Sequence, residues 1–449
     1  MASRVISKSS FIRGTKCPKS LWLHFFMPGV RDEISESQQS VFDTGHKVGT
    51  LAQQLFPGGI DASRGEFDKI EEAVRYTDEL IRSGSEVIYE AAFSDGETLC
   101  YMDILAKVDE VWKAYEVKAT ASVKEYHIKD AAFQYYVITR SGLDIKDVFL
   151  VHINNQYVRR GAIEVHRLFR MESLTKKIQA LQKNLPDQLL TLARVLQSRS
   201  MPLIEMGKHC TSPYNCDFIG FCSSAIPKPP EGTPDPSVRN QEKLDDFKAK
   251  LVYPLYFLDF ETIFPAVPIH DESRPFQHIP FQYSLHVSYD RNHKESPEHF
   301  YFLGTPPEDP RSALIESLIS RLGRKGSIIV WNAAFEKKCL SEIARDFPDY
   351  ARSIAPLFDR IVDLMIPFKK KYFYEPEMNK SYSLKSVLPA LVKDLSYFDL
   401  EIQEGTSASL AYESMYEDTD PGSVALKRQA LLDYCGLDTL SMVRIFELM

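Results

Sequence analysis

The segment LCYMDILAKVDEVWKAYEVK, residues 99–118, decides the fold expected for the first half of the chain. Its β-branched and aromatic residues predict two strands, 99–108 and 111–117, joined by a turn. Glu116 and Lys118 point to one face, because side chains alternate along a strand. Asp103 lies on the neighbouring strand, so three charged groups are expected to meet at adjacent strand ends. Such a group can hold a divalent cation and a hydrolytic water. The plainer alternative is a surface hairpin with a salt bridge.

The elements around this hairpin follow an α/β order. The expected helices are 16–26, 38–55, 128–141 and, as one long helix or a broken pair, 171–197. The other expected strands are 86–93 and 147–153. His46, in the second of these helices, can supply a nitrogen ligand to the same cation.

Four of the seven cysteines bracket this region, namely Cys17, Cys210, Cys216 and Cys222. They are far apart in sequence, but folding can bring them together as thiolate ligands of an iron–sulphur cluster, with zinc as the alternative. Cys100, Cys339 and Cys435 are expected to be packing residues. An odd, modest number of cysteines does not fit a secreted disulfide framework and favours a reducing cytoplasm.

A proline-rich stretch, IPKPPEGTPDP at 226–236, predicts an extended linker, because proline is excluded from helix interiors and central strands. We therefore expect a first domain over 1–225, a linker over 226–248 and a second domain over 249–449. The second domain also predicts an α/β layer structure. Its expected strands are 255–260, 281–288, 299–303 and 327–331, and its helices are 312–322, 335–345 and 424–447.

Carboxylates recur at the ends of apolar segments in this second domain. The strand LYFLDFET, 255–262, presents Asp259 and Glu261 on one face. Glu336 follows a buried strand, and Tyr434 and Asp438 lie one helical turn apart. Four acids can hold two Mg²⁺ ions about 3.5–4 Å apart, with the tyrosine orienting an attacking water. The alternative is a strand-end turn and an exposed helix face.

The order of motifs in the first half resembles the PD-(D/E)XK nucleases of the RecB-like branch. The motifs are Gly45-His46, Asp103, Glu116-Val117-Lys118 and Gln134-Tyr135-Tyr136. With the four cysteines, the resemblance is to the iron–sulphur subgroup, which includes CRISPR-adaptation nucleases and AddB-type nuclease domains. It implies a restriction-endonuclease-like core with a [4Fe–4S] cluster. It also implies Mg²⁺ or Mn²⁺ ligands at His46, Asp103 and Glu116, a catalytic Lys118, and supporting DNA contacts from Gln134 and Tyr135.

The second half resembles the DEDD, or DnaQ-like, 3′→5′ exonucleases of the tyrosine subclass. The resemblance implies an RNase H-like mixed sheet with flanking helices. It implies Mg²⁺ or Mn²⁺ ligands at Asp259, Glu261, Glu336 and Asp438, with Tyr434 catalytic. Glu336 stands where that family usually has aspartate.

A basic and aromatic run lies between these motifs, KKKYFY at 369–374, followed by Lys385. Cations beside aromatic rings suit a single strand, through phosphate contacts and base stacking. The residues expected to bind nucleic acid are Lys369, Lys370, Lys371, Tyr372 and Lys385. The alternative is a solvated loop whose aromatic residues belong to the core.

Net charge of −8 argues against nonspecific coating of DNA but leaves room for a nuclease with a local basic track. No window of the sequence approaches a membrane-spanning length. We expect a cytoplasmic metal-dependent nuclease acting on DNA ends or single strands, in repair, CRISPR adaptation or defence against foreign DNA. The alternatives are a nucleic-acid-binding scaffold with inactive sites and an RNA-processing exonuclease.

Overall fold

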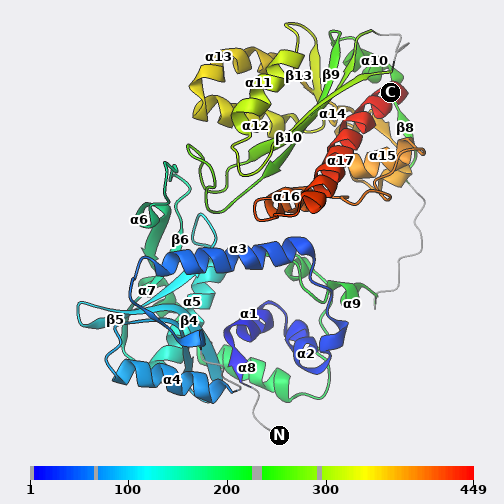
Figure 1. The fold of residues 1–449 in the computed structure, drawn as a ribbon. Helices are drawn as coiled ribbons and strands as arrows, with labels where there is room; N and C mark the ends of the chain where they lie inside the picture. The colour runs from blue at the N-terminus through cyan, green and yellow to red at the C-terminus, as the bar shows by residue number, and fades with distance from the viewer. Residues whose placement is uncertain (1–4, 65–68, 225–234, 291–295) are drawn as a thin grey trace. The chain divides into compact units, whose positions relative to one another are not determined.

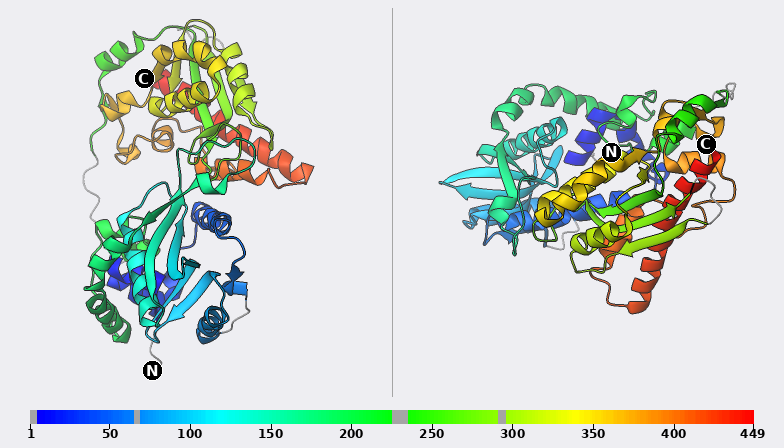
Figure 2. Two further views of the ribbon diagram at one scale, coloured as in Figure 1. Left: turned by 90° about the vertical axis from the view of Figure 1, so that its left-hand side faces the viewer. Right: turned by 90° about the horizontal axis from the view of Figure 1, so that it is seen from above.

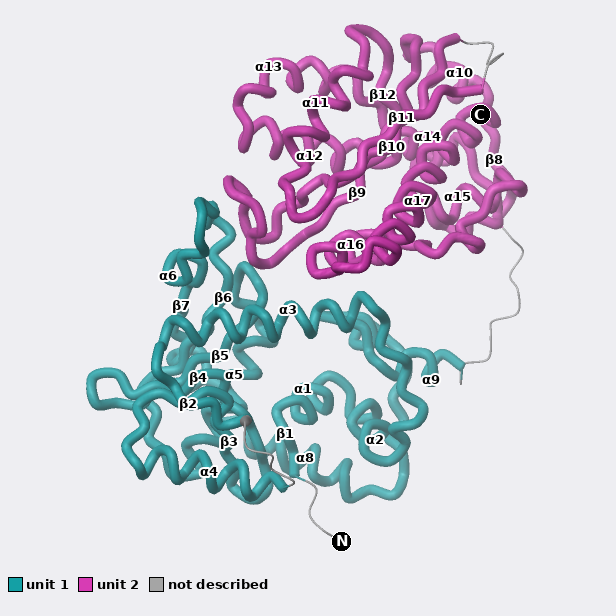
Figure 3. Tube along the Cα trace, viewed as in Figure 1, with its two compact units in different colours: residues 1–228 teal, residues 229–449 magenta. Residues whose placement is uncertain are grey.

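A computed structural model describes residues 5–64, 69–224, 235–290 and 296–449. The chain divides into two compact units, residues 1–228 and 229–449 (Figure 3). Each unit combines a β-sheet with helices, so the predicted α/β class is confirmed. Within the described ranges, no helix has both the length and the apolar character needed to cross a membrane.

Unit 1 is built on a sheet with the strand order β2-β3-β4-β5-β6-β7, and β1 pairs with β4 (Figure 1). Its strands are β1 (Ile6–Ser7), β2 (Ile60–Asp61), β3 (Val87–Ser94), β4 (Thr98–Val108), β5 (Val111–Lys118), β6 (Ile145–Ile153) and β7 (Phe169–Ser173). Its helices are α1 (Lys8–Lys16), α2 (Pro18–Phe26), α3 (Glu36–Gln53), α4 (Ile70–Arg82), α5 (Glu125–Arg140), α6 (Val165–Leu168), α7 (Thr175–Gln182), α8 (Leu185–Gln197) and α9 (Ile219–Ser224).

The core of unit 1 forms where α5 packs along β3, β4 and β6. The apolar side chains of α5, such as Phe133 and Val137, are fully buried against sheet residues such as Leu150. Phe11 of α1 stacks on Phe133 with ring centroids 4.8 Å apart, which joins the N-terminal helices to the same core. Burial of these side chains supplies the main stabilisation of the unit.

Unit 2 contains a five-stranded mixed sheet in the order β11-β10-β9-β12-β13, and a separate pair, β14-β8. β9, β10 and β11 are antiparallel neighbours, whereas β12 runs parallel to both β9 and β13. The strands are β8 (Val238–Arg239), β9 (Leu255–Ile263), β10 (Ile279–Ser288), β11 (Glu298–Leu303), β12 (Ser327–Val330), β13 (Ile361–Asp363) and β14 (Phe373–Tyr374). The helices are α10 (Gln241–Lys248), α11 (Arg311–Arg321), α12 (Ala333–Asp346), α13 (Ala351–Ile354), α14 (Ile366–Lys369), α15 (Leu384–Leu391), α16 (Gly405–Ser414) and α17 (Pro421–Leu448).

Both faces of the unit 2 sheet are covered. Alternate residues of β9 enter two different cores: Leu255 and Phe257 enter one, and Tyr256 and Leu258 the other. The first core is closed by α17, which lies along β9 and β10 (Figures 1 and 2). The second is closed by α11 and α12. The middle of β9 and the middle of α17 are thereby held side by side.

The helix expected over 16–26 is confirmed as α2, and a further helix that was not predicted, α1, precedes it and ends at Lys16. Two expectations about elements are corrected. The segment expected to be helical from 171 begins with strand β7, which pairs with β6 and ends at Ser173. The linker expected over 226–248 is too long, because β8 and α10 lie within it and Leu244 is fully buried in the unit 2 core. The proline stretch falls mainly on residues 225–234, outside the described ranges.

Candidate functional site

Two neighbouring strands of unit 1 bring Asp103 and Glu116 together. β4 pairs antiparallel with β5, and the last register pair is Ile104 opposite Tyr115. Asp103 and Glu116 are the next positions along the two strands. The Asp103 carboxylate accepts a 2.6 Å hydrogen bond from the backbone N–H of Val117. The side chain of Asp103 is thus fixed beside Glu116, as the sequence predicted.

A third carboxylate, Glu90, was not predicted. The register of β3 against β4 places Glu90 opposite Asp103. Its backbone adopts a positive φ of 52°, a conformation that residues other than glycine rarely adopt. Burial, together with the charges of Asp103 and Glu116, raises the pKa of Glu90 to about 7. A single acid inside an apolar strand carries no pattern that would have singled it out.

Glu116 is fully buried and is surrounded by donors. Its Oε1 accepts from the ammonium groups of Lys118 at 2.6 Å and Lys8 at 2.8 Å. Its Oε2 accepts a 2.6 Å hydrogen bond from the Gln134 amide. Lys118 also lies 3.2 Å from Asp130. The structure therefore brings the predicted Asp103, Glu116, Lys118 and Gln134 into one polar cluster, and adds Lys8 and Asp130.

The charges in this cluster are unevenly balanced. Burial opposes ionisation of Glu116, but Lys118 and Lys8 outweigh it and hold its pKa below the usual range. Burial and the charge of Glu116 raise the pKa of Asp103 to about 6. Asp103 and Glu90 thus have too few positively charged neighbours to keep both carboxylates ionised. A divalent cation is the kind of ligand that would stabilise both in the ionised form.

Two other predicted residues of unit 1 lie apart from this cluster. His46 is exposed on α3, and no hydrogen bond or ion pair of the described residues joins it to these carboxylates. Tyr135 is partly buried and packs against the hydrophobic core. Neither side chain makes a described contact that supports its expected role.

The four predicted cysteines line one small pocket of unit 1. Cys17 lies at the junction of α1 and α2, and the backbone N–H of Cys216 donates to the carbonyl of Cys210 at 2.7 Å. All four are free thiols. No three of their sulphurs lie within 4.8 Å of one another, since the one such metal-binding group among the described residues is elsewhere. The four cysteines therefore share one pocket, and the group that they bind stays a prediction.

Ion pairs fasten the cysteine pocket to the N-terminal helices. Arg13 of α1 makes a bidentate pair with Asp217, with N–O distances of 2.5 and 2.8 Å. Arg31 approaches the same carboxylate at 2.6 Å. Asp217 lies beside Cys216, so these contacts hold the segment that carries three cysteines against the segment that carries Cys17.

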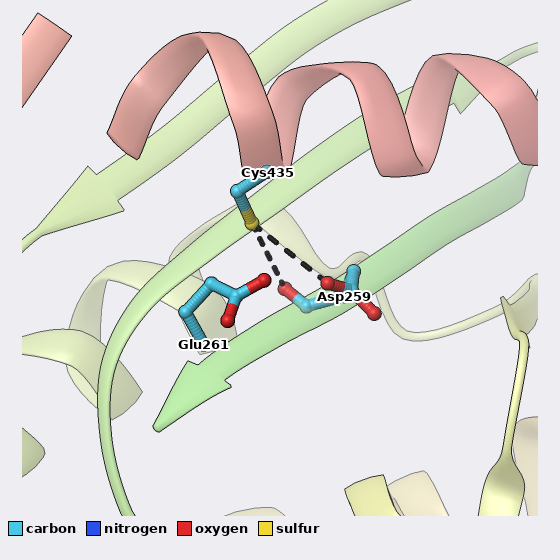
Figure 4. A group of neighbouring side chains, drawn as sticks. All are labelled: Asp259, Glu261 and Cys435. Atoms are coloured by element: carbon cyan, nitrogen blue, oxygen red, sulfur yellow. Dashed lines mark hydrogen bonds between the residues drawn. The ribbon is translucent and has the colours of Figure 1, made fainter. Parts of the chain in front are cut away.

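In unit 2, β9 and α17 together form a second carboxylate cluster. Glu261 is buried and Asp259 is partly exposed, both on β9. The thiol sulphur of Cys435 on α17 lies 3.9 Å from both the carbonyl oxygen and the Oδ2 of Asp259 (Figure 4). One ligand atom from each of Asp259, Glu261 and Cys435 lies within 4.8 Å of the others. Cys435 was expected to be a packing residue; it is fully buried, and it also lies beside these carboxylates.

Two tyrosines and a lysine complete this cluster. The hydroxyl of Tyr397 donates a 2.5 Å hydrogen bond to Asp438. The ammonium of Lys385 lies 5.1 Å from the ring centroid of Tyr434 and 5.6 Å from that of Tyr397. Lys385 also lowers the pKa of Glu261 and Asp438 against the larger, opposite effect of their burial. Lys385 therefore lies at this carboxylate cluster, while Tyr397 is a contact that the sequence analysis missed.

Glu336 lies in the first turn of α12 and is almost wholly buried. Its Oε2 has no hydrogen-bond partner among the described residues. Burial, together with the charge of Asp363, raises its pKa to about 8. The charge of Glu336 also raises the pKa of Asp259.

The second cluster contains more carboxylates than cations. Burial and the charge of Asp438 raise the pKa values of Asp259 and Glu261 well above their usual range. Burial raises the pKa of Asp438 to about 6, although Tyr397 and Lys385 oppose that shift. Such a group is costly to ionise unless a cation lies between its members. The geometry is that of a candidate metal centre.

The basic and aromatic run at 369–374 is partly exposed and partly buried. Lys369, Lys370 and Lys371 are exposed and remain candidates for phosphate contacts. Phe373 and Tyr374 are buried in the core, and Tyr372 packs against it. Tyr372 is only partly buried, and its contact with a base stays a prediction. The alternative of core aromatics describes Phe373 and Tyr374.

Two comparisons with known proteins complete the description. Residues 256–383 match a family described as a domain of unknown function, DUF2779. This range includes Asp259, Glu261 and Glu336 but ends before Lys385, Tyr434 and Asp438. The chain is also similar to the uncharacterized protein MG366 homolog of Mycoplasma pneumoniae, with 27% identity over 215 residues. That alignment covers 44% of this chain and 32% of the relative, so the chain spans about a third of that curated relative's length.

Proposed function

We propose that the chain is a divalent-cation-dependent nuclease with two separate phosphodiesterase sites. One observation carries the proposal. Asp259, Glu261 and Asp438 lie together beside Tyr434, with fewer positively charged side chains than carboxylates. Strand β9 and helix α17, far apart in sequence, both contribute to that pocket. The mixed sheet with flanking helices supports the resemblance to DnaQ-like exonucleases.

In the second site, Asp259, Glu261, Asp438 and Glu336 would hold Mg²⁺ or Mn²⁺. When bound, such a cation lowers the pKa of water and neutralises charge on the phosphate. Tyr397 holds Asp438 in place through its short hydrogen bond. Lys385 is exposed at the edge of the cluster, where it can contact a phosphate of the incoming strand. Asp259 is partly exposed, which leaves the cluster open to substrate.

In the first site, Asp103, Glu116 and Glu90 would hold the cation. Lys118 lies close enough to Glu116 to orient a water or to neutralise charge on the phosphate. Gln134 and Lys8 fix the orientation of Glu116. The cysteine pocket would hold a [4Fe–4S] cluster, whose role here is to tie the N-terminal helices to the segment at 210–222.

The test is cleavage of end-labelled single-stranded DNA, duplex DNA and RNA in Mn²⁺, Mg²⁺ and Ca²⁺. We expect Mn²⁺ and Mg²⁺, but not Ca²⁺, to support shortening of the strands. Asp259→Asn and Glu116→Gln should each lower the rate at one site by at least 100-fold. The matched controls are exposed acids nearby, Asp433→Asn on α17 and Glu110→Gln next to β5.

The outcomes distinguish the alternatives. Absence of cleavage by the wild type with every substrate and metal would overturn the proposal in favour of a binding scaffold. Faster cleavage of RNA than DNA would assign the activity to RNA processing. Loss of activity in only one of the two variants would leave one working site. Visible absorption of anaerobically purified protein, lost in Cys216→Ser, tests the cluster, and a colourless preparation that contains zinc would contradict it.

A further inference from the structure

The thiol of Cys435 gives the second cluster a donor of a different chemical kind. Cys435 is fully buried on α17, with its sulphur 3.9 Å from Asp259 Oδ2 and within 4.8 Å of a Glu261 oxygen (Figure 4). Within the described residues, this is the one group of three or more such ligand atoms this close together. Two carboxylates and one sulphur therefore point into the same small space.

The distances suit a metal that accepts sulphur. A tetrahedral ion that binds oxygen at about 2.0–2.2 Å and sulphur at about 2.3 Å separates these ligand atoms by roughly 3.6 Å. The observed 3.9 Å between Cys435 and Asp259 differs from that separation by a few tenths of an ångström. Mg²⁺ prefers oxygen ligands, whereas Zn²⁺ and Co²⁺ accept thiolate together with carboxylate.

A second observation points to a ligand at this place. Glu336 is almost wholly buried, and its Oε2 has no hydrogen-bond partner among the described residues. Its charge raises the pKa of Asp259, a member of this group. The rival explanation is that the Cys435 thiol only donates to Asp259, but a sulphur contact of 3.9 Å is a weak hydrogen bond.

We propose that Asp259, Glu261 and Cys435 form a binding site for a thiophilic divalent cation of the Zn²⁺ class. Cys435 releases its proton to solvent and coordinates as the thiolate, with no change of oxidation state. Because Asp259 and Glu261 are shared, this cation excludes Mg²⁺ or Mn²⁺ from them and inhibits cleavage. The inhibition rests on the proposed nuclease function, whereas the binding does not.

Cobalt(II) is the probe for binding, because a thiolate ligand gives it a charge-transfer band in the near ultraviolet. The full-length chain is titrated as wild type, Cys435→Ser and Cys339→Ser. Cys339 is a buried thiol of the same unit outside this group, and the five cysteines of unit 1 are common to all three proteins. We expect the spectrum of wild type minus Cys435→Ser to show the band of one thiolate, and Cys339→Ser to match the wild type.

Identical cobalt spectra for the wild type and Cys435→Ser would overturn the proposal. If Cys435→Ser does not fold, Asp259→Asn is the second test. This variant keeps the Cys435 thiol but loses a carboxylate ligand, so the same band should weaken. In the cleavage assay with Mn²⁺, the Zn²⁺ concentration for half inhibition should rise at least tenfold in Cys435→Ser. A Cys435-dependent band in a protein that cleaves nothing would retain this site while refuting the nuclease proposal.

Discussion

At the scale of single residues, the two carboxylate clusters use opposite solutions to the same electrostatic problem. Glu116 is kept ionised by two lysine ammonium groups within hydrogen-bonding distance. In the second cluster, Lys385 lowers the pKa of Glu261, while the charge of Asp438 raises the pKa values of both Asp259 and Glu261. The second cluster therefore destabilises the folded protein whenever no cation is bound.

This difference predicts the effect of Asp259→Asn on stability. Without divalent cations, removal of one negative charge should raise the melting temperature of unit 2, because repulsion with Asp438 and Glu261 is relieved. Mn²⁺ should stabilise unit 2 of the wild type, by about 2.7 kcal/mol at 100 times its dissociation constant, but should not stabilise unit 2 of the variant. Calorimetry with EDTA and with Mn²⁺ measures both effects. A variant less stable than the wild type in EDTA would contradict the prediction, and Asp433→Asn serves as the control.

Tyr397→Phe tests the contact that the sequence did not reveal. The change removes a hydroxyl that donates to Asp438 and preserves the ring beside Lys385. A hydrogen bond to a charged group contributes about 1.5–3 kcal/mol, so kcat should fall by roughly 10- to 150-fold. Tyr283→Phe removes a buried hydroxyl bonded to Ser317 and should leave kcat unchanged. An unaltered rate in Tyr397→Phe would show that Asp438 does not depend on this bond.

A buried histidine predicts how stability depends on pH. His286 is bonded to Thr439 at 2.8 Å, and burial and the neighbouring His299 lower its pKa to about 3. The unfolded chain, with a pKa of about 6.5, takes up the proton first. The contribution of His286 is thus complete above pH 6.5 and is lost as the pH falls towards 3, by at most about 1.4 kcal/mol per pH unit.

His286→Gln isolates this contribution. The free energy of unfolding of the wild type should decrease more steeply between pH 7 and 5 than that of the variant. The other titrating groups are common to both proteins and cancel in the difference. Parallel pH curves from urea titrations would exclude the assigned role of His286.

The acids that could be predicted from the sequence share a simple property: each belongs to a motif of two or more charged residues at a set spacing. Asp103, Glu116, Asp259 and Glu261 are of this kind. Glu90, Lys8 and Tyr397 carry no such signal, since each reaches its cluster through contacts between distant segments. Periodicity reports which face a residue takes, but not which remote residue it will meet.

At the scale of elements, long periodic segments were predicted to within a few residues. The strands β3, β4, β5 and β10 and the helix α17 are examples, because their apolar pattern coincides with burial in a core. The short elements were not predicted correctly. β7 was merged into a helix, and α10 was assigned to the linker although Leu244 anchors it in the core. Their stability comes from tertiary packing rather than from local pattern.

Helix α11 starts at a fully buried arginine, which predicts a large effect of Arg311→Leu. Arg311 pairs with Asp309 and with Asp346, itself 1% exposed. Removal of one partner from a buried ion pair costs about 3–5 kcal/mol, because the remaining charge is left uncompensated. Arg274 and Arg345 still contact Asp346, so the lower part of that range is expected. Arg321→Ala, an exposed residue at the other end of the helix, should cost less than about 1 kcal/mol in the same urea titration. Equal effects of the two changes would contradict this role for Arg311.

At the scale of the whole molecule, each unit has its own cores and its own polar cluster. The similarity to DUF2779 falls entirely within unit 2, and the cysteine pocket lies entirely within unit 1. Each unit should therefore unfold independently of the other, and each cluster should depend only on the stability of its own unit. Two compact units with separate cores generally unfold as separate cooperative transitions.

Core substitutions in each unit test this separation. Leu150→Ala removes a fully buried side chain from the unit 1 core and should cost about 2–5 kcal/mol. Phe257→Ala does the same in unit 2, at about 3–5 kcal/mol. Calorimetry should show two transitions, of which Leu150→Ala lowers one and Phe257→Ala the other. The transition lowered by Leu150→Ala should also be the one affected by Cys216→Ser, while the other should respond to Mn²⁺ through Asp259. If either substitution shifts both transitions equally, the units unfold as one body, and losses of activity at one cluster could no longer be assigned to that cluster alone.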